Sequence, residues 1–141
     1  MAELNLVEKV IVLEGVDLMS SLSPDQMASI AMIATEVQYP PGRAIFEEKK
    51  CVEAVYVVVS GSVELSRGGE PLDTAGPGAM LGGWALLDED CRSTVGAKTL
   101  EDTHLLRVGR EEFRDLMADN VDIAVQLLSA LAKQFGKLVE Q

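Results

Sequence analysis

Two glycine-bearing turns, followed by an arginine and two hydroxyl side chains, form the part of this sequence best suited to chemistry. Gly76-Pro77-Gly78 is the first turn, and Leu81-Gly82-Gly83 is the second. The second turn leads into an apolar run, 84–87, that is long enough for one helical turn. A glycine turn that opens a helix leaves backbone N–H groups unpaired beside the positive end of the helix dipole. Both features attract a phosphate or another small anion.

An arginine and two hydroxyls follow this run and complete the chemistry that a phosphate site needs. Charge-assisted hydrogen bonds from such groups hold a phosphate more firmly than neutral donors do. Two other interpretations stay open: the glycines only turn the chain, and Arg92 only pairs with the acidic run 88–90. The candidate ligand-binding residues are Gly82, Gly83, Trp84, Ala85, Leu86, Arg92, Ser93 and Thr94.

The remaining reactive side chains do not form a catalytic or metal-binding pattern. Cys51 and Cys91 match no metal-ligand spacing, and His104 is the single histidine. We find no nucleophile–base pair and no paired carboxylates in a credible cleft, which argues against an enzyme. We therefore expect no catalytic residue, no metal and no required cofactor. We expect both cysteines to be inert free thiols and His104 to be structural or exposed.

The charge balance narrows the classes of partner. Twelve basic and 23 acidic residues give this 141-residue chain a formal charge of −11. Nucleic acids are bound chiefly through Lys and Arg clusters, so the charge predicts no nucleic-acid binding by this chain and disfavours an anionic membrane. The first residues lack the basic and apolar regions of a signal peptide, and no run approaches a membrane span. These features predict cytoplasmic residence.

Helical signals come first along the chain. Apolar residues at helical spacing predict a helix over 4–13. Ser23-Pro24-Asp25-Gln26 then has the pattern of a capping box with proline at the first helical position. The apolar face that follows predicts a second helix that ends near Glu36.

A series of short strands is predicted next. The run 54–60 is β-branched and apolar on both faces, as in a central buried strand, and Gly68-Gly69 predicts a hairpin. Turn signals recur about every 8–12 residues, the spacing of an antiparallel sandwich or jelly roll. We therefore predict one domain, 1–141, with a β-roll over about 37–109.

Two helices are predicted over about 110–140. The first, 110–118, places Phe113, Leu116 and Met117 on its apolar side. The last carries apolar residues at three positions of a heptad, more than one packed face usually needs. We predict that this helix joins a second copy or a neighbouring domain through Val121, Leu128, Leu131, Phe135 and Leu138.

Motifs along nearly the whole chain match one known family in order. They are Leu22-Ser23-Pro24, Tyr39-Pro40-Pro41-Gly42, Ile45-Phe46, residues 55–63, Pro77-Gly78, Leu81-Gly82, Ala85-Leu86-Leu87 and Phe113. Through these motifs the whole chain resembles the cyclic-nucleotide-binding domains of catabolite-activator-type regulators and of kinase regulatory subunits. That resemblance implies a mainly β fold with flanking helices: a double-stranded β-helix (jelly roll) with N-terminal helices and C-terminal B and C helices. It also implies that the last helix is both a dimer contact and a lid over the ligand.

The phosphate-binding cassette of this family, here Met80 to Thr99, departs from the usual pattern. The family has Gly-Glu where this chain has Gly82-Gly83, and that glutamate holds the ribose 2′-hydroxyl. The family's phosphate arginine falls on Arg92 when counted from Gly82, but on Cys91 when counted back from Val95. Trp84 replaces a medium aliphatic residue, although it is also suited to core packing, and Lys49-Lys50 replaces a Gly-Asp turn.

Three functions remain in competition. The first is a non-catalytic regulatory or sensor domain in signal transduction that binds cyclic AMP, cyclic GMP or another small anion weakly or not at all. The second is a protein–protein interaction or dimerisation module with no small-molecule ligand. The third is the N-terminal sensor part of a longer transcription regulator.

Overall fold

A computed structural model describes residues 3–83 and 88–139, except for the side chain of Leu138. Helix α1 (Leu6–Glu14), the 3₁₀ turn η1 (Asp17–Met19) and helix α2 (Pro24–Ile33) open the chain. The capping box at Ser23 is confirmed, because its hydroxyl accepts the Gln26 N–H at 3.1 Å and its own N–H donates to Gln26 Oε1 at 2.9 Å. Pro24 takes the first helical position, as predicted.

The predicted end of this second helix, near Glu36, is wrong. The chain leaves α2 after Ile33, and strand β1 (Ala34–Tyr39) begins at once. The reason is a long-range pairing: β1 runs antiparallel to β8 (Thr103–Gly109) along its whole length, from Ala34 opposite Val108 to Tyr39 opposite Thr103. The backbone hydrogen bonds of that ladder outweigh the local helical pattern, so the roll begins three residues earlier than predicted.

The strands form two four-stranded antiparallel sheets, which confirms the jelly-roll fold. One sheet has the order β1-β8-β3-β6, and the other has the order β2-β7-β4-β5. The remaining strands are β2 (Ala44–Phe46), β3 (Ala54–Ser60), β4 (Val63–Arg67), β5 (Glu70–Ala75), β6 (Met80–Leu81) and β7 (Gly96–Thr99). Gly68 and Gly69 have positive φ in the turn between β4 and β5, as the predicted hairpin requires.

Strand β3 divides the hydrophobic core into two parts. Val55 and Val57 face a cluster formed with the helices, which includes Phe113 and Ile123. Ala54, Tyr56 and Val58 alternate with them and face a second cluster inside the roll. Successive side chains of a strand point to opposite faces, so this strand is apolar on both. The prediction of a central buried strand is confirmed.

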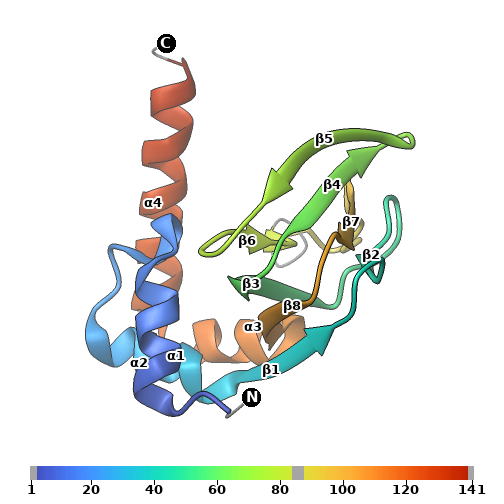
Figure 1. Cartoon of the computed structure of the whole chain (residues 1–141). Coiled ribbons are helices and arrows are strands. Elements are labelled where there is room, and N and C mark those ends of the chain that lie inside the picture. Colours follow the sequence, from blue (N-terminus) through green and yellow to red (C-terminus); the bar gives the residue numbers. More distant parts are fainter. Residues whose placement is uncertain (1–2, 84–87, 140–141) are drawn as a thin grey trace.

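Helix α3 (Arg110–Asp119) follows β8 directly, and helix α4 (Val121–Val139) ends the described chain. Figure 1 shows α4 as a long helix on the same side of the molecule as α1, while the strands of the roll lie on the other side. Ile123 and Ala130 of α4 are buried. A second apolar face of the same helix is exposed and comprises Val121, Val125, Leu128, Phe135 and Val139.

Candidate functional site

A cavity of about 670 Å³ lies between the inside of the roll and the C-terminal helices. On the roll side it is lined by Phe46, Leu65 and Val95, and by the chain from Met80 to Gly83. Residues of η1, α3 and α4 form the opposite wall, among them Phe113 and Leu131. The volume falls in the range of small-molecule sites, which run from about 300 to 1,000 Å³. As the resemblance implies, α4 borders the cavity.

The described part of the cassette, together with the turn residues 78 and 79 before it, has two arms. The first arm, 78–83, contains both predicted glycines, and Gly82 and Gly83 line the cavity. Gly82 has φ +80°, and a Cβ there would lie 3.0 Å from the Ala54 carbonyl oxygen. Gly83 has no such need: its Cβ would meet only the flexible end of Met80, at 3.2 Å. Position 83 therefore has room for a side chain, whereas position 82 requires glycine.

The second arm, 88–95, carries the other predicted ligand groups. Arg92 and Thr94 are exposed and are not among the cavity-lining residues. Ser93 is half-buried, and its hydroxyl donates to the Val95 carbonyl at 2.6 Å and accepts the Val95 N–H at 3.2 Å. The structure thus brings Gly82 and Gly83 to the cavity but does not bring Arg92, Ser93 or Thr94 there.

Three predicted ligand residues, Trp84, Ala85 and Leu86, lie outside the described residues. Their assignment to the site stays a prediction.

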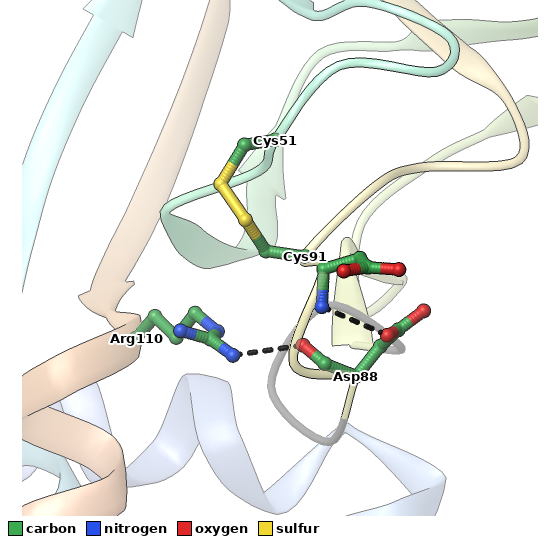
Figure 2. The surroundings of a disulfide bond; sticks show 5 residues. Cys51, Asp88, Cys91 and Arg110 are labelled. Carbon is green, nitrogen blue, oxygen red and sulfur yellow. Dashed lines mark hydrogen bonds between the residues drawn. A yellow bond between two sulfur atoms is a disulfide. The ribbon is translucent and has the colours of Figure 1, made fainter.

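The expectation of two free thiols is wrong. Cys51 and Cys91 form a disulfide with their Cα atoms 4.7 Å apart, although 40 residues separate them in the sequence (Figure 2). That Cα distance lies within the range of native disulfides. The pairing arises because the chain around Cys51 forms a β-bridge with Arg92. Disulfides are rare in reducing compartments, so this bond does not support the predicted cytoplasmic residence, which stays a prediction.

Backbone hydrogen bonds also join the second arm to the segment 49–52. The Val52 N–H donates to the Cys91 carbonyl at 2.7 Å. At the other end of the bridge, the Lys49 N–H donates to the Ser93 carbonyl at 2.7 Å. On the opposite side, Arg110 Nη2 donates to the Asp88 carbonyl at 2.7 Å, as Figure 2 shows. The second arm is therefore held at Asp88 and at residues 91–93.

Lys50, at the tip of the neighbouring loop, is directed to a partner on the surface. Its Nζ lies 2.6 Å from Glu47 Oε2. This hydrogen bond and the charge of the carboxylate raise the pKa of Lys50 above its ordinary value. Lys50 does not line the cavity.

The chemistry of the cavity is dominated by apolar side chains. Among its described lining residues, Arg114 of α3 is the one cation, and Gln134 of α4 is the one neutral polar side chain. Arg114 is exposed, so its charge lies at the rim. Such a cavity favours an apolar or aromatic surface, and the backbone of Gly82 and Gly83 supplies polar groups beside it. Sequence reasoning did not assign Leu18 or Arg114 to the site, because no local signal links η1 or α3 to the roll.

His104 has a structural contact, as one of its two predicted interpretations required. It is 4% exposed, and its Nε2 lies 2.7 Å from Glu36 Oε1. The other oxygen of Glu36 accepts the Leu4 N–H at 2.8 Å. This pair joins β1, β8 and the N-terminal segment away from the cavity.

Two features are absent from the described residues, a metal-binding cluster and a membrane-spanning helix. Over 3–83 and 88–139 there is no group of three or more His, Cys, Asp or Glu side chains placed to hold a metal ion. No described helix combines the length and apolar character that crossing a membrane requires.

Known proteins share both the sequence and the fold of this chain. The cyclic AMP receptor protein of Thermus thermophilus is 34% identical over 127 residues, which cover 86% of this chain and 58% of the relative. A cAMP-dependent protein kinase regulatory subunit of Aspergillus fumigatus is 37% identical over 118 residues, 79% of this chain and 27% of the relative. The chain thus spans less than two thirds of the length of these relatives.

Solved structures agree with the sequence matches. The N-terminal domain of a transcriptional regulator from Streptomyces coelicolor superposes with a TM-score of 0.80 at 26% identity, covering 92% of each chain. The Thermus thermophilus catabolite activator protein gives a TM-score of 0.73 at 31% identity, covering 86% of this chain and 59% of that one. The sequence model of the cyclic nucleotide-binding domain matches residues 36–120. The chain belongs to the cyclic nucleotide-binding domain family.

Proposed function

We propose that this chain is a non-catalytic regulatory domain of the cyclic-nucleotide-binding type, and that it binds cyclic AMP and cyclic GMP weakly or not at all. Its relatives are named as a cyclic AMP receptor protein and as a kinase regulatory subunit, which supports a regulatory role. The single observation that supports weak binding is that residue 83 is a glycine. This residue lines the cavity at the position where the family has a glutamate for the ribose hydroxyl.

The charge distribution around the cavity supports the same proposal. A cyclic nucleotide brings a phosphate charge, which needs a desolvated cationic partner to bind tightly. Arg92 is exposed, and Cys91 packs against the inner cluster of the roll in a disulfide. Neither places a guanidinium on the described cavity wall. The remaining phosphate donors on the described wall are backbone groups of the first arm and the exposed guanidinium of Arg114 at the rim.

Restoring the missing carboxylate tests this account. Gly83→Glu is sterically feasible, since only the methyl end of Met80 has to move. A hydrogen bond to a charged group contributes about 1.5–3 kcal/mol, so the variant should bind cyclic AMP about 10- to 150-fold more tightly than the parent. Gly83→Gln is the matched control, with the same shape and no charge, and we expect a smaller gain.

Calorimetric titration with cyclic AMP and cyclic GMP provides the measurement. Micromolar binding by the unmodified chain would contradict weak binding. If Gly83→Glu gains nothing over Gly83→Gln, the missing carboxylate is not the main defect of the site.

A second candidate function is self-association through α4, and the exposed apolar face of that helix favours it. Val121, Leu128 and Phe135 of the predicted contact are 63%, 58% and 68% exposed. Leu128 and Leu131 both line the cavity, and Leu131 is half-buried; the side chain of Leu138 lies outside the described part. A second copy of the same face would cover Phe135 and its apolar neighbours.

Sedimentation of Phe135→Asp against the parent tests this second function. The variant places a charge in the exposed apolar face, so it should turn a dimer into a monomer. Phe135 does not line the cavity, so the fold should stay intact. Ser129→Asp places the same charge on an exposed position of α4 outside the apolar face and should leave the dimer unchanged. A parent that sediments as a monomer would exclude this function for the isolated chain.

A role as the sensor part of a longer transcription regulator remains a proposal too. It is supported by the regulators among the relatives, of which this chain spans 58%. The sequence of the complete gene tests it directly: a helix-turn-helix after the last helix would support it, and a stop there would contradict it.

A further inference from the structure

We infer that the Cys51–Cys91 disulfide is a thiol–disulfide exchange site, and that its redox state sets how firmly the second arm of the cassette is held. The co-reactant is a dithiol, which reaches Cys51 from solvent. The inference concerns the arm itself and does not depend on whether a nucleotide binds in the cavity.

The two sulfurs lie in different surroundings, which gives the exchange a direction. Cys51 is exposed, whereas Cys91 is half-buried and packs against the inner cluster of the roll. A nucleophile reaches the exposed sulfur more readily, so Cys51 is the sulfur attacked and Cys91 the one that leaves.

A polar cavity of about 290 Å³ lies beside Cys51. It is lined by two half-buried cations, Arg107 and Arg110, and by three exposed glutamates, at 53, 111 and 112. Cations near a sulfur stabilise the thiolate that reduction produces, and the glutamates oppose them. This cavity gives a small polar thiol a place to approach Cys51. It shares no lining residue with the cavity beside Gly82 and Gly83.

The exchange proceeds in two steps, each of which forms one bond to sulfur and breaks another. One thiolate of the dithiol attacks Cys51 Sγ and forms a mixed disulfide, while the bond to Cys91 Sγ breaks and Cys91 leaves as a thiolate that takes a proton from water. The second thiolate of the reductant then attacks the reductant's own sulfur in that mixed disulfide. Cys51 is released as a thiolate, and the dithiol becomes a disulfide, so two electrons have passed to the protein. The reverse reaction with an oxidised dithiol restores the bond.

Reduction should loosen the second arm and leave the fold intact. Without the covalent link, the arm is still joined to 49–52 by backbone hydrogen bonds, such as that from Val52 N–H to the Cys91 carbonyl. These bonds belong to an isolated bridge outside the named strands, so they open more easily than a full ladder. Two departures from the family pattern lie on the two sides of this disulfide: Lys49-Lys50 on one side, and on the other the position of the phosphate arginine, which falls on Arg92 or on Cys91.

Two measurements on the full chain test the inference. Incubation of the oxidised protein with glutathione, followed by acid quenching and mass spectrometry, locates the mixed disulfide. We expect at least about tenfold more adduct on Cys51 than on Cys91, since the attack follows exposure. Equal labelling, or resistance to dithiothreitol until the protein unfolds, would overturn the exchange site.

Hydrogen exchange before and after dithiothreitol treatment measures the arm. Exchange in peptides that cover 49–53 and 88–95 should accelerate at least about tenfold on reduction, while peptides of β8 stay unchanged. The double variant Cys51→Ser, Cys91→Ser is the control: it should exchange like the reduced protein and show no response to dithiothreitol. Unchanged exchange at 88–95 in the reduced parent would show that the disulfide does not hold the arm.

Discussion

The two arms of the cassette are built on different principles. The first arm is set by backbone conformation: Gly78 and Gly82 have φ +88° and +80°, and the Gly78 N–H donates to the Val58 carbonyl at 2.9 Å. The second arm is set by cross-links, a disulfide to Cys51 and hydrogen bonds to 49–52. The predicted glycine turn thus forms in the first arm, while the predicted ligand side chains of the second arm make other contacts or face solvent.

Breaking the disulfide should have the largest effect on stability. In the chain-entropy account, closing a loop of 40 residues stabilises the folded state by about 4 kcal/mol. Cys51→Ser should therefore lower the unfolding midpoint by roughly 10 °C in calorimetry without reductant. With dithiothreitol present, parent and variant should melt together. A variant that melts like the oxidised parent would show that the cross-link is not the main support of the second arm.

Alanine substitutions should distinguish the two adjacent glycines of the first arm by their effect on stability. Gly82→Ala forces a Cβ toward the Ala54 carbonyl at positive φ, and we expect a loss of about 2 kcal/mol. Gly83→Ala meets only the end of Met80 and should change stability by less than about 0.5 kcal/mol. Urea unfolding of both variants measures the difference. Equal losses would contradict a first arm set by the conformation of Gly82.

Within the second arm, Ser93 should contribute a small amount through its hydroxyl. Ser93→Ala removes two contacts with the Val95 backbone and should cost about 1 kcal/mol in the same unfolding experiment. If the hydroxyl instead served a ligand, the loss would appear in binding and not in stability.

Arg92 should give the smallest effect. Its side chain is exposed, so Arg92→Ala should change stability by less than about 0.5 kcal/mol. Because Arg92 does not line the cavity, the substitution should also leave the affinity of Gly83→Glu for cyclic AMP unchanged. A large loss of that affinity would show that the second arm turns Arg92 toward a bound phosphate.

The parts of the fold that depend on neighbouring residues could be predicted from the sequence. The capping box at Ser23 and the buried strand 54–60 are local patterns, and both form as expected. The start of β1 at Ala34 could not be predicted, because its pairing partner in β8 lies about 70 residues away. The disulfide was missed for the same reason: its two loops meet only when the roll closes.

The candidate site was predictable on one side only. Gly82 and Gly83 are visible as a turn, whereas the wall from η1, α3 and α4 depends on tertiary packing that no local pattern encodes. The orientation of Arg92 could not be predicted either, since counting from Gly82 and counting back from Val95 give different registers. In the structure Cys91 packs against the inner cluster and Arg92 is exposed.

We propose that the cassette keeps its glycine turn but lacks the groups that make cyclic-nucleotide binding tight. Calorimetric titration of the unmodified, oxidised chain with cyclic AMP tests it most directly. This proposal predicts no saturation at micromolar concentrations, because Gly83 supplies no carboxylate and Arg92 does not line the cavity. A micromolar or tighter Kd for the unmodified chain would contradict the claim.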